Sequence, residues 1–323
     1  MAFVLAKLGW SVDKLVSQPP KAVKDWGKSV GDLLPVLPKS SAPPAWATSE
    51  DAWATVPKPK RGDGWSEDPA RTAGESNFFS IDGVEYMFRW APAGTFRMGS
   101  GENVYLGGDD EKVHSVKLTR GFWMLETEVA QAMWQSVMGN NPSFFKGGDF
   151  APEKFPVEGV SWNDAVEFCK KASRMKGVPK GYEFRLPTEA QWEYACRAGT
   201  RTRYSWESRD SASKYCAVDR TRTLPVGEFG DFEPNNWGIY DMHGNVREWR
   251  VDKYGEYTGD ATDPAKAVRG PGKRVCRGGA WNSRKTNGES GFMGLDIGPD
   301  DWPACRSAAR DKETPPRIIL VFA

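Results

Sequence analysis

The pattern of apolar and polar residues predicts that the compact part of the chain opens as β-sheet. Apolar side chains recur between residues 78 and 90 on both sides of Asp82-Gly83, a dipeptide that favours the left-handed backbone of a hairpin turn. His114, Val116 and Leu118 then alternate with polar residues, the period of a further strand. The sequence therefore predicts a hairpin followed by at least one more strand.

After these strands, the apolar residues recur at the spacing of amphipathic helices. The first predicted helix begins with Thr127 as its cap and stops at Gly139. The second begins at Ser161, and the third begins at Thr188, which opens a Thr-x-x-Gln capping box, and ends before Gly199. A sheet followed by three short helices predicts an α+β domain.

The side chains of the predicted helices indicate which of their faces are apolar and which are charged. Cys169 and Cys196 fall on apolar faces and are interpreted as core residues without a catalytic role. Four charged residues at helical spacing predict a salt-linked polar face. They are Arg185, Glu189, Glu193 and Arg197.

The chain before this domain has a different character. Residues 1–18 space their apolar side chains as an amphipathic helix, which packs on its own domain or docks on another protein. Residues 19–76 are rich in proline and tryptophan and predict an extended arm, with disorder as the alternative. Residues 77–323 form the predicted compact domain. Three tryptophans are candidates for anchoring the arm to it: Trp46, Trp53 and Trp65.

Composition narrows the class of protein. Fifteen tryptophans, 34 glycines and 23 prolines indicate a loop-rich fold held by large aromatic side chains. The net charge of +1 gives no reason to expect a nucleic acid or an anionic membrane as partner. The sequence has no basic leader and no apolar stretch of about 18 residues, so we expect no membrane span and a cytoplasmic location.

Several kinds of site are excluded by residue type. His114 and His243 are the only histidines, so a multi-histidine metal site is excluded, and neither lies in a nucleophile motif. The five cysteines contain no C-x-x-C, which predicts reduced thiols rather than a disulfide framework or a zinc ribbon. No phosphate-binding glycine motif occurs.

The stretch from Asn236 to Trp249 combines two tryptophans, two glycines and the series D-x-x-G-x-V-x-E. Asp241 and Glu248, with glycine and backbone carbonyls between them, form the all-oxygen set that Ca²⁺ prefers. The alternative is a polar turn between two buried tryptophans.

The C-terminal part begins with a predicted strand, residues 274–277, that enters a glycine turn. From residue 282 to residue 303 the chain loses periodicity, and a loop of that length is either functional or disordered. An apolar strand at residues 318–322 is expected to close the fold.

Taken together, the motifs resemble those of the formylglycine-generating enzyme (sulfatase-modifying factor) family, from about Phe79 to Arg310. They include Pro92-x-Gly94-x-Phe96-x-Met98-Gly99, Val160-Ser161-Trp162, Arg185-Leu186-Pro187-Thr188-Glu189, Gly244-Asn245-Val246-x-Glu248-Trp249 and Arg277-Gly278-Gly279-Ala280-Trp281. The resemblance implies a loop-rich α+β domain with the C-type lectin fold and bound calcium. By position, its calcium ligands are the side chains of Asp241 and Glu248 and the carbonyls of Gly244 and Val246.

The catalytic chemistry of that family does not carry over. Family catalysts hold copper between two cysteines and use oxygen to oxidise a peptidyl cysteine. Ser283 and Trp302 stand at the two positions here, which argues against copper and against an enzyme. A displaced site between Cys276 and Cys305 is the alternative. The family's terminal strand is also replaced, by residues 318–323.

The tail resembles that of the variable proteins of diversity-generating retroelements, which are ligand-binding members of the same fold family. Its matching segments are 277–281 and 305–310. We therefore predict a non-catalytic ligand-binding or protein-recognition module whose recognition region is 281–323 and whose partner is a protein or peptide. The predicted contact residues are Trp281, Asn282, Arg284, Asn287, Phe292, Met293, Trp302, Arg306, Asp311, Lys312 and Glu313.

Two alternatives remain open. One is the family's copper- and oxygen-dependent oxidation of peptidyl cysteine to formylglycine, which rests on analogy. The other is an assembly subunit that the N-terminal helix and arm tether to a larger complex.

Overall fold

A computed structural model describes residues 65, 71–100, 110–146, 151, 154–206, 215–218, 220–227, 232–265, 272–283 and 310–313. The chain divides into two units, Met1–Ala54 and Thr55–Ala323, and all the described residues belong to the second. The predicted N-terminal helix, the arm tryptophans Trp46 and Trp53, and the predicted strand at 318–322 lie outside the described residues.

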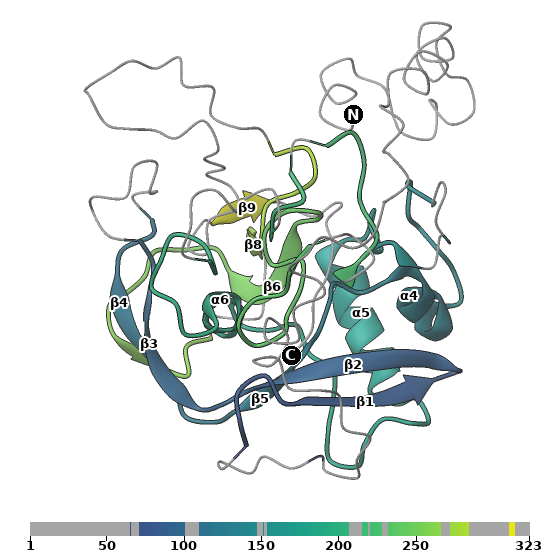
Figure 1. Ribbon diagram of the computed structural model, residues 1–323, viewed down its shortest axis with the longest axis horizontal. Coiled ribbons are helices and arrows are strands. Elements are labelled where there is room, and N and C mark those ends of the chain that lie inside the picture. The colour runs from purple at the N-terminus through teal and green to yellow at the C-terminus, as the bar shows by residue number, and fades with distance from the viewer. Residues whose placement is uncertain are drawn as a thin grey trace, which may run out of the picture. The chain divides into compact units, whose positions relative to one another are not determined.

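Three short sheets make up the β-structure of the described residues (Figure 1). The first has the order β1-β2-β5, the second β3-β4-β7 and the third β6-β8-β9. Their bounds are β1 Ser76–Ile81, β2 Val84–Ala91, β3 Gly94–Met98, β4 His114–Leu118, β5 Phe122–Leu125, β6 Glu248–Lys253, β7 Ala261–Thr262, β8 Arg274–Arg277 and β9 Asp311–Glu313. All neighbouring strands are antiparallel except β4 and β7, which are parallel.

The first hairpin confirms the alternation read from the sequence. Strands β1 and β2 pair from Ser76 opposite Arg89 to Ile81 opposite Val84. The residues between them, Asp82 and Gly83, have φ of 49° and 79°. Both turn residues are left-handed, which is the geometry that suits the twist of a two-residue hairpin.

Three helices follow: α4 Gln131–Met138, α5 Trp162–Ala172 and α6 Glu189–Arg197. Helices α5 and α6 have the predicted capping boxes at Ser161 and Thr188. The predicted cap of α4 is wrong, because this helix starts three residues later, after Ala130 and without a side-chain cap. The Thr127 hydroxyl instead donates to the carbonyl of Glu128.

The core joins these elements through large aromatic side chains. Trp90, Trp134, Trp192 and Trp249 are almost completely buried. Helix α4 lies beside the β1-β2 hairpin and packs on α5, whereas α6 lies near β3, β6 and β8 (Figure 1). Helix α6 thus stands between the second and third sheets, where the side chains discussed below converge.

Trp65 confirms part of the predicted anchoring of the arm. Its ring lies 5.5 Å from Phe79, 5.6 Å from Phe88, 5.0 Å from Trp123 and 5.7 Å from Tyr182, between ring centroids. Four aromatic contacts fix this residue on the domain.

None of the helices in the described segments combines the length and the apolar character needed to cross a bilayer.

Candidate functional site

The turn from Asp241 to Glu248 lies deep in the domain. Asp241, Val246 and Glu248 are buried, and Glu248 is the first residue of β6. Asp241 and Gly244 have φ of 60° and 106°. A side chain at Gly244 would place its Cβ 2.5 Å from the carbonyl oxygen of Ala217, so this position accepts only glycine.

The two carboxylates of the turn each have one oxygen that is paired and one that is not. Asp241 Oδ2 accepts from the Gly227 amide at 2.7 Å, and Glu248 Oε2 accepts from Trp192 Nε1 at 2.8 Å and from Arg250 Nη2 at 2.6 Å. Asp241 Oδ1 and Glu248 Oε1 are buried and have no hydrogen-bond partner. A buried anionic oxygen without a donor is unfavourable unless a cation or a proton neutralises it.

A third carboxylate, Glu128, lies beside them and was missed by the sequence analysis. Its Oε1 accepts from the Val246 amide at 3.0 Å, and its Oε2 accepts from Asn245 Nδ2 at 2.7 Å. Both of its oxygens are thus engaged in fixing the turn. Because Glu128 is more than a hundred residues away in the chain, no local motif links it to this site.

The protonation of the three carboxylates reflects this environment. Burial raises the pKa of Asp241 to about 7, to which the charge of Glu248 adds. Burial also raises the pKa of Glu248 to about 7, against the effect of Arg250. Burial, with the charges of Asp241 and Glu248, holds the pKa of Glu128 well above its ordinary value. The hydrogen-bond donors around these three carboxylates therefore do not compensate for their negative charge.

The chemistry of the ligand atoms determines which metal ion would suit the carboxylate turn. The predicted ligands are two carboxylates and two backbone carbonyls, an all-oxygen set that suits a hard cation such as Ca²⁺. The described segments hold no group of three or more His, Cys, Asp or Glu side chains arranged to hold a metal. The predicted set contains only two such side chains, and the unpaired oxygens of Asp241 and Glu248 are compatible with it.

The same turn supports the start of the predicted C-terminal recognition region through backbone hydrogen bonds. The Gly244 amide donates to the Gly278 carbonyl at 2.7 Å, and the Trp281 amide donates to the Asn245 carbonyl at 2.7 Å. The glycine turn after β8 is thereby held directly on the carboxylate turn.

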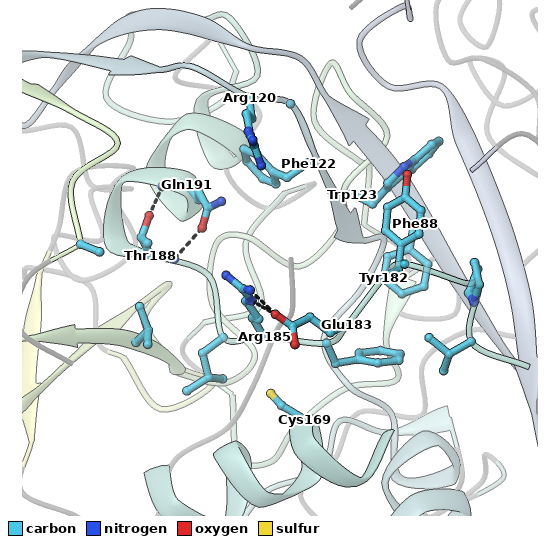
Figure 2. A pocket seen from close by; sticks show the side chains of 18 of the residues that line it. Phe88, Arg120, Phe122, Trp123, Cys169, Tyr182, Glu183, Arg185, Thr188 and Gln191 are labelled. Carbon is cyan, nitrogen blue, oxygen red and sulfur yellow. Dashed lines mark hydrogen bonds and ion pairs between the residues drawn. The ribbon is translucent and has the colours of Figure 1, made fainter. Parts of the chain in front are cut away.

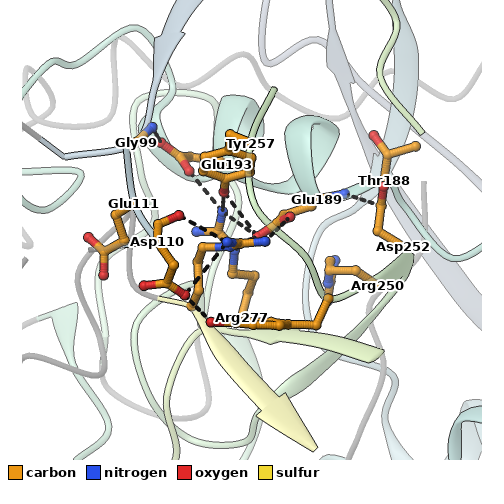
Figure 3. Close-up of polar contacts among 12 residues, drawn as sticks. Gly99, Asp110, Glu111, Thr188, Glu189, Glu193, Arg250, Asp252, Tyr257 and Arg277 are labelled. Carbon is orange, nitrogen blue, oxygen red and sulfur yellow. Dashed lines mark hydrogen bonds and ion pairs between the residues drawn. The ribbon is translucent and has the colours of Figure 1, made fainter. Parts of the chain in front are cut away.

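The two ends of the segment between β8 and β9 meet at one carboxylate of α6. Arg277, the last residue of β8, lies 3.0 Å from Glu189 Oε1 and 2.9 Å from Glu193 Oε2 (Figure 3). Arg310, next to β9, lies 2.7 Å from the same Glu189 oxygen. Strands β8 and β9 pair with Cys276 opposite Asp311. The two described ends of the segment thus lie close together on the domain.

Further bonds complete this network, which we call the tail anchor: Glu189, Glu193, Arg197, Arg277 and Arg310. Arg197 pairs with Glu193 at 2.9 Å. Burial alone would raise the pKa of Glu189, but the charges of Arg277 and Arg310 outweigh it and lower this pKa. Both carboxylates of the tail anchor are therefore paired with arginines of the protein itself.

The tail anchor corrects the expected polar face. Glu189, Glu193 and Arg197 are buried, and the two glutamates bind the distant arginines Arg277 and Arg310. Helical spacing shows which residues share a face, but not whether that face meets solvent.

Arg185 does not belong to this face. It precedes the helix and forms an exposed ion pair with Glu183 (Figure 2). The helical spacing of Arg185 was therefore fortuitous.

Among the predicted contact residues, the structure describes the side chains of two. Trp281 is half-buried and Asn282 is exposed. For Asp311, Lys312 and Glu313 it describes the backbone of β9 only. The remaining six lie outside the described residues: Arg284, Asn287, Phe292, Met293, Trp302 and Arg306.

Ser283 has a structural role at the position where family catalysts have a cysteine. It is buried, and its hydroxyl accepts from the Ala280 amide at 3.0 Å. Cys276 is buried within β8 and paired opposite Trp249 of β6, while Cys305 lies outside the described residues. A serine hydroxyl is not the soft thiolate that copper requires, so the described part of this position does not fit a copper site.

A separate cavity of about 940 Å³ lies between the first sheet and α5 (Figure 2). Its walls are aromatic at Trp65, Phe88 and Trp123, and polar at Arg185 and Gln191. It contains none of the predicted site residues. Trp65 is one of its walls, so the cavity is partly formed by the segment that precedes the domain.

The fold defines the class of protein to which this chain belongs. Treponema denticola variable protein 1 superimposes with a TM-score of 0.63 and 25% identity, covering 76% of this chain and 98% of that one. The α+β architecture with few helices and short mixed sheets is the C-type-lectin-like fold that the motifs predicted.

Sequence comparison gives the family. The sulfatase-modifying factor enzyme 1-like domain matches residues 87–318, and the chain belongs to that family. The chaperone protein LppX of Paenibacillus barcinonensis is 30% identical over 233 residues, which cover 55% of this chain and 77% of that protein. The formylglycine-generating enzyme of Mus musculus is 30% identical over 185 residues, 50% of this chain and 47% of the enzyme, so the match spans about half the length of that relative.

Proposed function

We propose that this protein is a non-catalytic recognition module that presents the segment between β8 and β9 to a protein or peptide ligand. The observation that carries the proposal is the tail anchor. Arg277 and Arg310, which flank the segment, bind the same buried carboxylate of Glu189. A long segment with both ends fixed at one point is suited to vary in sequence without changing the domain beneath it.

The energetics of the tail anchor favour this use. Buried ion pairs contribute little net stability compared with apolar packing, but breaking one leaves an uncompensated charge and destabilises by about 3–5 kcal/mol. Such pairs therefore enforce one arrangement of the chain. Here the enforced arrangement is the side-by-side placement of β8 and β9.

Two further observations support recognition over catalysis. Ser283, in the place of a copper-binding cysteine, is used as a turn cap. The likeness to Treponema denticola variable protein 1 covers nearly all of that chain, and it agrees with the resemblance of the tail to retroelement variable proteins. A near-copy of the tail-coding DNA beside a reverse-transcriptase gene would support that narrower proposal, and its absence would remove it.

An exchange of the segment tests the proposal. Ser283 and Arg310 belong to the support, so residues 284–309 are the unit to replace with an unrelated sequence of equal length. We expect an unchanged thermal midpoint and a changed set of bound proteins in affinity capture with mass spectrometry. Unfolding of the exchanged protein, or an unchanged set of partners, would contradict the proposal.

We also propose that the carboxylate turn holds a structural Ca²⁺, with the side chains of Asp241 and Glu248 and the carbonyls of Gly244 and Val246 as ligands. The unpaired buried oxygens of the two carboxylates support this. The ion would neutralise the turn on which Gly278 and Trp281 rest.

The formylglycine-generating relatives support a second candidate function, the oxidation of a peptidyl cysteine. Incubation with Cu⁺, oxygen and a cysteine peptide, followed by mass spectrometry, tests it. Oxidation that Cys276→Ser abolishes, while the thermal midpoint is kept, would establish the enzyme and displace the recognition proposal.

The third alternative, an assembly subunit, concerns residues before the domain. Because Trp65 packs on the domain, the deletion that tests it should remove residues 1–64 rather than extend into the aromatic cluster. An unchanged mass of the oligomer after that deletion would argue against the assembly role.

A further inference from the structure

Phe144, Phe145 and Trp281 form a continuous aromatic surface, which we call the aromatic ridge. Phe144 is 67% exposed, and no other large hydrophobic side chain is exposed in the segments the structure describes. The ring of Phe145 meets Phe144 edge-on at 5.1 Å and meets Trp281 edge-on at 5.4 Å. The ridge therefore joins the loop after α4 to the beginning of the recognition region.

The loop that carries the two phenylalanines is ordered by its own hydrogen bonds. The Phe145 amide donates to Glu158 Oε1 at 2.6 Å, and the Phe145 carbonyl accepts from Gln131 Nε2 at 2.8 Å. Asn141 Nδ2 donates to Gln131 Oε1 at 2.7 Å, and Asn141 Oδ1 accepts from the Ser143 amide at 3.0 Å. A side chain displayed on so fixed a backbone loses little conformational entropy when it binds.

Trp281 is fixed in the same way. Its amide donates to the Asn245 carbonyl, and its carbonyl accepts from the Arg220 amide, both at 2.7 Å. Both sides of the ridge are therefore positioned before any partner arrives.

The flank of the ridge is cationic. The Arg222 guanidinium lies 5.9 Å from the centroid of Phe145 and 5.3 Å from that of Phe155. Its Nε is buried and makes no hydrogen bond. Arg220, whose backbone holds Trp281, and Lys146, which follows Phe145, are exposed.

We propose that the aromatic ridge binds an apolar side chain of an acidic polypeptide segment, with Arg222 and its cationic neighbours meeting the carboxylates beside it. This rests on the proposed recognition function and names the chemistry of its partner. Clustered aromatic and arginine side chains are the composition of binding hot spots, and exposed apolar surface beside polar groups is typical of interaction sites.

The charges of the flank favour such a partner over a second copy of this chain. In a symmetric dimer built on the ridge, the cationic flank of one copy would face that of the other. An acidic segment instead brings carboxylates to the exposed cations of the flank, Arg220 and Lys146.

The experiment uses the full-length protein and a phage-displayed library of random dodecapeptides. Selected peptides are synthesised with a fluorescent label, and their Kd is measured by anisotropy. We expect the selected sequences to share an aromatic or aliphatic residue next to Asp or Glu. Phe144→Ser should weaken their binding roughly tenfold or more, as loss of a hot-spot side chain does.

Matched variants separate the ridge from general effects. Phe144→Tyr retains the ring and should bind within about twofold of the wild type, as should Lys176→Gln, which removes an exposed cation of the α5-α6 connection. Arg222→Gln should weaken binding and reduce its salt dependence. Thermal midpoints of all variants show whether the domain is intact.

The outcomes test the proposed binding by the aromatic ridge separately from the recognition function on which that proposal rests. Selection of no peptide, a selected consensus without the apolar and acidic pair, or equal binding to Phe144→Ser overturns the ridge. Peptides that bind Phe144→Ser but not the variant exchanged at 284–309 overturn the ridge and leave the recognition segment in place. Peptides that still bind the exchanged variant, but not Phe144→Ser, support the ridge and count against the segment.

Discussion

The tail anchor and the carboxylate turn are both buried and charged, but they balance charge in different ways. In the tail anchor, Glu189 and Glu193 lie within ion-pair distance of three arginines. In the carboxylate turn, the charges of Asp241 and Glu248 raise the pKa of Glu128, the charge of Glu248 raises that of Asp241, and two carboxylate oxygens have no donor. The carboxylates of the first cluster are paired with arginines of the protein itself, whereas those of the second require protons or a cation from solution.

The largest expected effect is the loss of the Glu189 charge. Glu189→Gln removes the carboxylate that two arginines share, which leaves Arg277 paired with Glu193 alone and Arg310 with Asp110 at 3.6 Å. It should destabilise the domain by up to about 3–5 kcal/mol, the cost of breaking a buried ion pair completely. Denaturant unfolding followed by tryptophan fluorescence measures it. A loss of less than about 1 kcal/mol in the free energy of unfolding would show that the ion pairs of Glu189 behave like exposed pairs and contribute little to stability.

Removal of calcium should have the next largest effect. If the carboxylate turn binds Ca²⁺, addition of a chelator at neutral pH should lower the melting temperature, since an ion at a hundred times its Kd stabilises by roughly 2.7 kcal/mol. Differential scanning calorimetry with and without excess Ca²⁺ provides the measurement. An unchanged melting curve would leave the turn as hydrogen-bonded structure only.

The control for chelation follows from the contacts of the two ligands. Glu248→Ala should remove the sensitivity, but it also leaves Arg250 without its ion-pair partner. Asp241→Asn is cleaner, because Oδ2 has a single hydrogen bond, from Gly227, and Oδ1 has none. Chelator sensitivity that survives in Asp241→Asn would place the ion elsewhere.

The pH dependence of stability between about pH 4 and pH 7 should be present without calcium and lost when calcium is bound. Without the ion, Asp241 and Glu248 titrate near 7 in the folded state and near their ordinary values when unfolded. The folded state then binds more protons between about pH 4 and pH 7, so its stability falls as pH rises through this window.

Bound Ca²⁺ removes this dependence, because its ligands are already ionised. The stabilisation by Ca²⁺ should therefore be larger at pH 8 than at pH 5. Thermal melts at the two values, each with chelator and with Ca²⁺, measure the difference. Equal calcium effects at both pH values would contradict the assignment of these carboxylates as ligands.

The smallest effect is expected at the exposed pair of Glu183 and Arg185. Because both side chains are solvated, Glu183→Gln should change stability by only about 0–1 kcal/mol. The same unfolding experiment used for Glu189→Gln gives the comparison. A loss as large as that at Glu189 would show that burial does not explain the difference between the two clusters.

Local signals predicted many of the elements but not their surroundings. The hairpin at Asp82, the capping boxes at Ser161 and Thr188, and the core positions of Cys169 and Cys196 all follow from neighbouring residues, and the structure confirms them. The predicted cap of α4 was wrong because the hydroxyl of Thr127 donates to the carbonyl of Glu128 and does not accept from a backbone amide of the helix.

The sequence by itself determined the family and the lectin-like α+β fold, and predicted that Ser283 replaces a copper-binding cysteine, because ordered motifs and residue identities are properties of the chain. Tertiary structure alone placed Glu128 beside the carboxylate turn, joined Arg277 and Arg310 at Glu189, and set Phe145 beside Trp281. These groups are brought together by packing across long sequence separations. Whether a charge is buried, and whether it finds a partner, depends on those distant neighbours.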